Sequence, residues 1–174
     1  ERLRKGTDGY EYVLAWKDET RIQEDIAINE IDIENLIRTK AAIYAGCKVL
    51  LDSVGLGFKD LDQVIIAGGF GRHLDVGKAI FIGLLPEIDV GKFMFVGNGS
   101  LLGARLLSFS KDLLKETERI SLMMTNLELS NHPTFMNEFV AAMFLPHTDS
   151  SAFPQVMGRL YLARRGYPSE RIIE

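Results

Sequence analysis

The sequence predicts an α/β fold in which a mixed sheet has a parallel βαβ core flanked by helices. Two short apolar runs, 64–67 and 93–96, each end in glycines, as strands do where they open onto a loop. Apolar residues at helical spacing precede, separate and follow these runs, so the expected order is helix, strand, helix, strand, helix. This alternation favours a parallel strand pair joined by a right-handed crossover.

Composition excludes several classes of protein. With 174 residues and 47% hydrophobic content, the chain can bury one core and is typical of globular proteins. A net charge of −4 with scattered basic residues argues against a nucleic-acid surface. No apolar run approaches the length of a membrane span and no signal peptide is present, so we expect a soluble, cytoplasmic protein.

The single cysteine, Cys47, cannot form an internal disulfide. Because it falls on the apolar stripe of a predicted helix, we expect a buried side chain and not a reactive nucleophile. The chain also begins without methionine. We therefore expect a fragment or processed product of something longer.

A long helix dominates the first third of the chain. Asn29 and Asp32 match a capping box, and apolar residues then recur at helical spacing as far as Val54. We expect a helix over 30–54, on the order of 36 Å long at 1.5 Å per residue. Alternating side chains predict two strands before it, at 10–16 and 26–28.

The βαβ region follows. The four apolar residues 64–67 suit a strand covered on both faces. Asp75 is placed to cap a short helix that ends at Ile82, and Asn98 or Ser100 to cap a helix over 101–109.

The last third is less regular. Charged residues at 110–119 indicate a solvated helical face, 125–129 suits a strand, and apolar residues over 135–144 predict a helix after Pro133. The side chain of Phe139 on that helix is expected in the core. We expect a domain over 1–155 and a tail over 156–174 that packs on it or is partly disordered.

The loop Gly68-Gly69-Phe70-Gly71 is the first candidate site. Three glycines in four positions exceed what one tight turn needs, and a backbone without side chains lets a flat ring or a phosphate approach closely. A purely structural strand-to-helix turn is the alternative. We favour a ligand-binding loop.

The segment 97–103 is the second candidate and reads GxGxxxG after a strand. The pattern suggests phosphate binding at a helix N-terminus, but the interval after it holds Glu116 and Glu118 in a charged helix, where a dinucleotide fold has a strand. Close packing of the helix on the sheet explains Gly103 equally well. There is no P-loop, and the three histidines lack metal-ligand spacing, so no metal site is predicted.

With its two glycine-rich segments at 68–71 and 97–103, the chain resembles the C-terminal lobe of the acetate and sugar kinase, heat-shock cognate and actin (ASKHA) superfamily. This lobe has an actin-like, ribonuclease H-like fold. Residues 64–71 match its adenosine motif, and 95–104 match its second connecting element. Within the superfamily, the chain is most similar to the reductive activators of corrinoid proteins (RACo and RamA-like). That resemblance rests on 35–46, 64–71, 82–86, 127–130 with Phe135, and 142–147.

The resemblance implies a function and a set of partners. Members of that branch use ATP to return an inactive Co(II) corrinoid protein to Co(I), with an N-terminal [2Fe-2S] domain, and are often homodimers. Carried onto this chain, the resemblance implies an adenosine-binding lobe for ATP or ADP with Mg²⁺, acting on a corrinoid protein. The residues it assigns to the nucleotide are Gly68, Gly69, Phe70, Gly71, Asn98 and Ser100, with Lys40 and Tyr44 facing the glycine turn and flanking the adenine.

The chain departs from the family pattern in two respects. The superfamily's Asp-containing phosphate hairpins, of the form DxG[TS], are missing; residues 6–9 read Gly-Thr-Asp-Gly, the same residue types in a different order. Cysteines for a cluster are missing too. Metal, phosphate and electron-transfer chemistry would then lie upstream, and no catalytic residue is assigned here. Two alternatives stay open, a small-molecule kinase of the same superfamily and a non-enzymatic module that docks a partner through 135–144.

Overall fold

The computed structural model describes residues 2–165, and its strands form two sheets. An antiparallel sheet of order β1-β2-β3 comes first, and a parallel pair, β4-β5, follows. The strands are β1 (Leu3–Gly6), β2 (Gly9–Ala15), β3 (Ile26–Asn29), β4 (Val64–Ala67) and β5 (Phe93–Gly97). The helices are α1 (Glu30–Asp52), α2 (Val76–Phe81), α3 (Gly99–Phe109), α4 (Lys111–Met123), α5 (Phe135–Ala142) and α6 (Pro154–Arg164).

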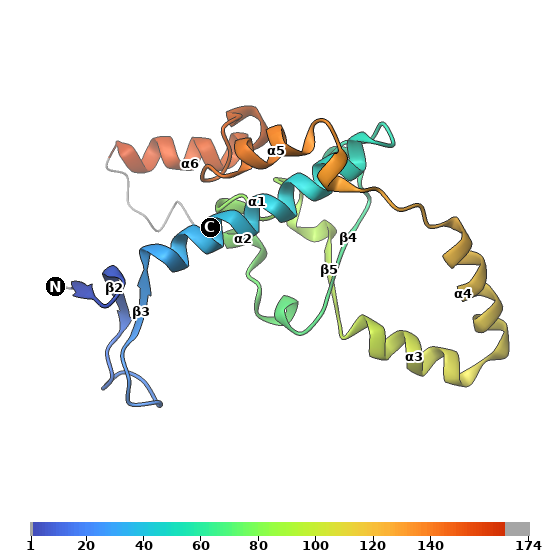
Figure 1. The fold of residues 1–174 in the computed structure, drawn as a ribbon, viewed down its shortest axis with the longest axis horizontal. Coiled ribbons are helices and arrows are strands. Elements are labelled where there is room, and N and C mark those ends of the chain that lie inside the picture. Colours follow the sequence, from blue (N-terminus) through green and yellow to red (C-terminus); the bar gives the residue numbers. More distant parts are fainter. Residues whose placement is uncertain (1, 166–174) are drawn as a thin grey trace.

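Helix α1 runs through the middle of the molecule and the other elements are arranged around it (Figure 1). Helix α5 packs along one side of α1, and the β4-β5 pair lies below it in this view. Helices α3 and α4 project from β5 as an arm. Among the described helices, none combines the length and apolar character that crossing a membrane requires.

The predicted βαβ core is confirmed. Strands β4 and β5 are parallel, with Val64 opposite Phe93 and Ala67 opposite Gly97. Helix α2 belongs to the crossover between them, and the carboxylate of Asp75 caps it by accepting from the amide of Lys78 at 3.0 Å. Because the pair is parallel, both strands end at the same edge.

The predicted long helix is confirmed as α1, including its capping box. The side chain of Asn29 accepts from the amide of Asp32 at 2.8 Å, and the carboxylate of Asp32 accepts from the amide of Asn29 at 3.0 Å. The helix ends at Asp52, and Gly55 follows with a φ of +74°. This left-handed conformation is one that glycine adopts readily, which explains the stop.

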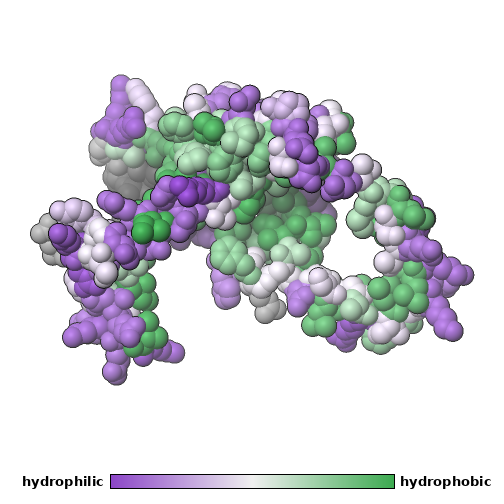
Figure 2. All heavy atoms as spheres, in the orientation of Figure 1, coloured by the Kyte–Doolittle hydropathy of each residue, from purple (hydrophilic) through white to green (hydrophobic). Residues whose placement is uncertain are grey.

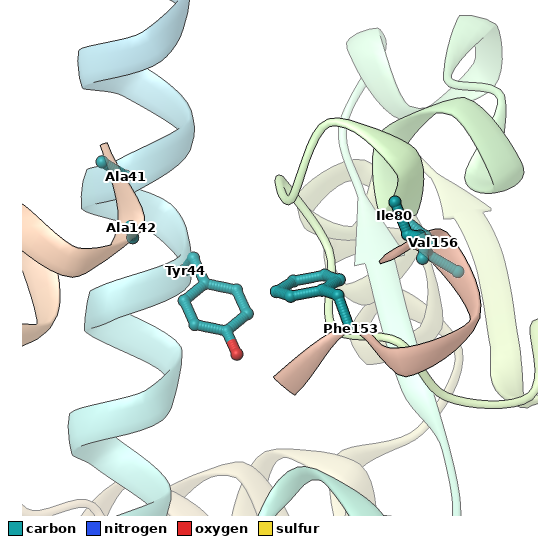
Figure 3. Packing of buried hydrophobic residues seen from close by; sticks show 6 residues of the cluster. All are labelled: Ala41, Tyr44, Ile80, Ala142, Phe153 and Val156. Carbon is teal, nitrogen blue, oxygen red and sulfur yellow. The ribbon is translucent and has the colours of Figure 1, made fainter. Parts of the chain in front are cut away.

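The core lies where α1, α2, α5 and the start of α6 meet (Figure 3). The rings of Tyr44 and Phe153 approach with centroids 5.5 Å apart. Phe139 packs against this cluster, as predicted. The buried cluster consists of Ala41, Tyr44, Ile80, Ala142, Phe153 and Val156.

Two sequence predictions about strands are wrong. The segment 124–128 has no strand partner and runs into a short 3-10 helix, Leu129–Asn131, so the strand expected at 125–129 does not form. Conversely, β1 was not predicted. It pairs antiparallel with β2, and Arg4 also contacts Glu11 at 2.6 Å and Asp25 at 2.5 Å, long-range contacts that local alternation does not reveal.

Two predictions about burial are also wrong. Strand β4 is not covered on both faces, since the side chain of Ile65 is 59% exposed. Cys47 is exposed on the surface of α1. Both predictions assumed that every apolar stripe meets a neighbouring element, and in the described part of the chain these two do not. The pKa of the Cys47 thiol is still raised, because apolar side chains around it exclude water.

The C-terminal region contains one further packed helix. Val156 of α6 is buried in the core, and the expected boundary between residues 155 and 156 falls inside this helix. Residues 166–174 of the expected tail lie outside the described residues. The division into domain and tail stays a prediction.

Candidate functional site

Two glycine-rich corners, residues 68–71 after β4 and 97–100 after β5, lie side by side at the carboxyl edge of the β4-β5 pair. The amide of Gly68 donates a hydrogen bond of 2.5 Å to the carbonyl oxygen of Gly97, just where Ala67 pairs with Gly97 in the sheet. Parallel strands place their carboxyl ends together, and ligands of α/β proteins bind at this kind of edge. The two corners therefore form one continuous stretch of bare backbone.

Glycine is required by backbone conformation at two of these positions. Gly68 has a φ of +105° and Gly97 a φ of +65°, a region that residues with a Cβ rarely adopt. A Cβ built on Gly68 or Gly69 would have no other atom within 4 Å. The space in front of the first corner is therefore open, and the glycines there are not explained by packing.

Gly71 has a different role from its neighbours. A Cβ at this position would lie 2.8 Å from Cγ2 of Ile66 and 3.4 Å from the ring of Phe95. Gly71 is buried, so it lets the chain turn back closely over the strand pair. The sequence motif groups it with Gly68 and Gly69, but in the structure its role is to allow close packing of the loop on Ile66 and Phe95.

Phe70 is the exposed side chain of the first corner. It lies in a short 3-10 helix, Phe70–His73, and is 80% exposed. A large aromatic ring in water next to bare backbone is unusual for a residue with only a structural role. The corner thus offers a flat apolar surface and unobstructed main chain together.

The second corner leads directly into α3. The side chain of Asn98 accepts from the amide of Leu101 at 3.0 Å and so caps the helix, as predicted. Ser100 is exposed in the first turn. A Cβ on Gly99 would lie 3.4 Å from Cβ of Ala67, which shows how closely the start of α3 approaches β4. The sequence prediction did not include Gly99, although the GxG spacing contains the signal.

Lys40 is not at these corners. Its side chain is fully buried, and Nζ donates to the carbonyl oxygen of Pro146 at 2.6 Å and also to that of Phe144. Burial lowers the pKa of the Lys40 ammonium to about 8.

Tyr44 also points into the core. Its ring packs on Phe58 with centroids 5.2 Å apart, and burial raises the pKa of the Tyr44 phenol. The expectation that Lys40 and Tyr44 face the glycine turn is therefore not met. Both lie on the side of α1 that α5 and Phe153 cover, a choice of face that depends on tertiary packing.

The described residues offer no obvious cation site. Across residues 2–165, no three or more histidine, cysteine, aspartate or glutamate side chains come together in a group that could hold a metal ion.

A long helix leading into a parallel βαβ unit, with two glycine corners joined at one sheet edge, is the architecture of a lobe of the ASKHA class of ATPases. The chain belongs to the family described as the C-terminal domain of RACo, the ASKHA domain, which it matches over residues 1–157.

The relatives are consistent with this family. Over 117 residues the chain is 38% identical to the corrinoid activation enzyme RamQ of Eubacterium limosum, covering 67% of this chain and 20% of that protein. Over 120 residues it is 28% identical to the [Co(II) methylated amine-specific corrinoid protein] reductase of Methanosarcina barkeri, covering 68% of this chain and 22% of that protein.

A solved structure, a reductive activator for a corrinoid, iron–sulfur protein, superposes with a TM-score of 0.82 at 54% identity. The superposition covers 88% of this chain and 24% of that one. The chain thus spans about a fifth of the length of the curated relatives it matches.

Proposed function

We propose that this chain is the adenosine-binding lobe of an ATP-dependent reductive activator of a corrinoid protein. The observation that carries the proposal is the hydrogen bond between Gly68 and Gly97, which makes one open backbone surface of two corners. Membership of the RACo C-terminal family and the names of the relatives support the choice of corrinoid activation over a small-molecule kinase.

The corners fit an adenosine by their shape and chemistry. The backbone at Gly68 and Gly69 has open space before it, so a flat purine and its ribose can approach the main chain directly. The exposed ring of Phe70 supplies an apolar surface for the base. Asn98 and Ser100 begin α3, whose first amides favour the negatively charged side of the ligand.

The rest of the chemistry would be supplied elsewhere in the parent protein. A [2Fe-2S] cluster needs four protein ligands, usually cysteines, and this chain has one cysteine. The Asp-containing phosphate hairpins of the superfamily are also missing from this sequence, so the ligands of Mg²⁺ and of the phosphates would lie outside it. A cluster held elsewhere in the parent would supply the one electron that takes Co(II) to Co(I), and ATP would be hydrolysed by water to ADP and phosphate.

The role of this lobe would be to bind nucleotide and to change position when it does so. Closure around ATP alters the affinity for a partner protein only if the open and the closed state bind that partner differently. The proposed partners are a corrinoid protein and a second copy of the activator. This chain alone is expected to bind nucleotide weakly and to hydrolyse none, because it carries one side of the site.

The test is isothermal titration of the full-length parent with ATP and ADP, comparing the wild type with Gly69→Leu. Gly69 has a right-handed conformation (φ −64°, ψ −34°) and open space at Cβ, so leucine is compatible with the fold but covers the corner. We expect an affinity loss of about tenfold or more, or roughly 1.4 kcal/mol.

Gly158→Leu is the matched control. This glycine also has open space at its Cβ, but it lies in α6 away from the corners. It should leave affinity unchanged. A parent that binds no adenine nucleotide, or a Gly69→Leu variant that binds as the wild type does, would contradict the proposal.

A further inference from the structure

The turn between α5 and α6 places a histidine against the core. The ring of His147 packs on the ring of Tyr44, with centroids 5.2 Å apart, and on the ring of Phe153 at 6.1 Å. Tyr44 and Phe153 are both buried, and Figure 3 shows that they meet between α1 and the start of α6. Figure 2 shows hydrophobic side chains gathered over α5 and α6. His147 is therefore a titratable side chain in largely apolar surroundings.

The hydrogen bonds of His147 fit the neutral ring. The amide of Asp149 donates to Nδ1 at 3.0 Å, so Nδ1 offers a lone pair and the proton of the neutral imidazole is on Nε2. Nε2 is buried and has no hydrogen-bond partner among residues 2–165. Because Nε2 is enclosed by this chain, no other part of the parent protein can reach it while the turn keeps this conformation.

Protonation of the ring would conflict with this arrangement. A proton on Nδ1 would occupy the lone pair that the Asp149 amide uses, so two donors would face each other. The positive charge would also lie in apolar surroundings with no acceptor for Nε2–H. Burial accordingly lowers the pKa of His147.

Charged and titratable side chains surround the ring from α1, α5, α6 and the turn itself. The carboxylates of Glu138 and Asp149 favour a protonated ring, whereas the ammonium of Lys40 opposes it. Nε2 donates to neither carboxylate, so burial has the larger effect. The full set is Lys40, Tyr44, Glu138, Asp149 and Arg164, the last of which lines with His147 a cavity of about 320 Å³.

His147 also lies where the turn leads into α6. The amide of Thr148 donates to the carbonyl oxygen of Ala141 at 3.0 Å, which fixes the turn to α5. On the other side of the ring contact, the carboxylate of Asp149 accepts from the amide of Ser151 at 2.9 Å, just before α6 begins after Phe153. The bond from Asp149 to His147 therefore joins the part of the turn held by α5 to the part that enters α6.

We propose that His147 is a pH switch for the start of α6. When the ring takes a proton from solvent, the bond from the Asp149 amide breaks, the imidazolium moves into water, and residues 147–153 open. Phe153 and the first turn of α6 then leave the core. The inference goes beyond the proposed function and does not rest on it.

The direction of the pH dependence follows from where the proton binds more tightly. In the open turn the imidazole has its ordinary pKa of 6.5, and in the closed turn that pKa is lower. The closed turn is therefore fully favoured above pH 6.5 and becomes less stable as the pH falls below that value. At pH 5.0 an exposed imidazole is protonated by about 30 to 1, which sets the largest effect that this single group can have.

Hydrogen–deuterium exchange of the full-length parent, read by mass spectrometry, is the test. Exchange of peptides covering 147–157 is measured at pH 7.5 and pH 5.0 and corrected for the intrinsic pH dependence of amide exchange. We expect local opening to increase by about tenfold at pH 5.0, within the limit of about 30-fold. A peptide from the first half of α1, residues 30–38, should keep its protection.

Two variants at His147 identify the titrating group. His147→Phe keeps a ring beside Tyr44 and Phe153 without a titratable nitrogen, and His147→Asn keeps an oxygen that can accept from the Asp149 amide. In both, the pH-dependent opening of 147–157 should be lost. The comparison is the ratio between the two pH values within each variant, so a general loss of stability does not affect it.

His132→Phe is the matched control. His132 lies before α5, with Nδ1 3.0 Å from the hydroxyl of Thr134, in an exposed contact. This variant should respond to pH as the wild type does. Any pH dependence that remains in the His147 variants measures other acids near α6, such as Glu87, whose carboxylate caps the helix.

Three outcomes would overturn the inference. The first is a wild type whose 147–157 segment opens equally at the two pH values. The second is the same increase in the wild type and in the His147 variants. The third is an equal loss of protection in 30–38, which would indicate global acid unfolding. None of these measurements depends on nucleotide, so a parent that fails to bind ATP would leave this result unchanged.

Discussion

The ammonium of Lys40 donates a hydrogen bond of 2.6 Å to the carbonyl oxygen of Pro146, with both side chains buried. A second bond from the same nitrogen reaches the carbonyl oxygen of Phe144. Buried lysines usually pair with an acid, but here two main-chain carbonyls just beyond α5 hold the charge. Lys40 thereby ties α1 to the turn that follows α5.

Replacing Lys40 by methionine should destabilise the fold. The change keeps the apolar stem but leaves two carbonyl oxygens without their donor, so the free energy of unfolding should fall by about 1–3 kcal/mol. Urea denaturation of wild type and variant measures this. Lys48→Met removes an exposed pair with Asp52 and should cost no more than about 1 kcal/mol. Equal losses in the two variants would contradict the role given to Lys40.

Stability should also depend on pH through Lys40. Burial lowers the pKa of its ammonium to about 8 from the ordinary 10.5, so between these values the unfolded chain binds more protons than the folded chain. The free energy of unfolding of the wild type, relative to Lys40→Met, should therefore rise as pH increases from 8 towards 10.5. It should be flat below pH 8. A relative decline over that interval in urea titrations would show that the sign is wrong.

A carboxylate from a distant loop caps α6. The side chain of Glu87 accepts from the amides of Gln155 and Val156 at 2.8 and 2.9 Å, where α6 has no capping side chain of its own. Glu87→Gln should lower the free energy of unfolding by about 1 kcal/mol, because the negative charge at the helix N-terminus is lost.

Glu34→Gln is the comparison for this change. It alters an exposed pair with Arg38 and should cost about 0.5 kcal/mol or less. Thermal unfolding of the two variants side by side gives the difference. A Glu87→Gln chain as stable as the wild type would mean that the cap contributes nothing to the fold.

Alanine substitutions at Gly83 and Gly55 distinguish the cost of backbone strain from the cost of a steric clash. Both are left-handed, with φ of +77° and +74°, but a Cβ on Gly83 would press directly on the carbonyl of Pro146, whereas Gly55 has open space. Gly55→Ala should cost about 1–2 kcal/mol from strain alone. Gly83→Ala should cost clearly more, measured by urea denaturation. A smaller loss at Gly83 than at Gly55 would contradict the packing around Pro146.

Local signals in the sequence were enough to predict most helices and the parallel pair. Caps such as Asn29 and Asp75, and stops such as Gly55, act within a few residues, so their effect is visible in the chain itself. The strand expected at 125–129 was wrong because a strand requires a neighbour, and no local pattern shows whether one is present. Strand β1 was missed for the same reason, since Arg4 finds its acids across the sheet.

The sequence by itself determined where the glycines and strand ends fall, and thus that two corners of bare backbone exist. Only the tertiary structure decided which residues lie at these corners. The register of β4 on β5 places Gly68 against Gly97. The packing of α5 on α1 buries Lys40 and Tyr44 in the core instead. A turn or cap follows from conformational preferences of a few adjacent residues. The side of a helix that becomes buried follows from which distant element packs on it.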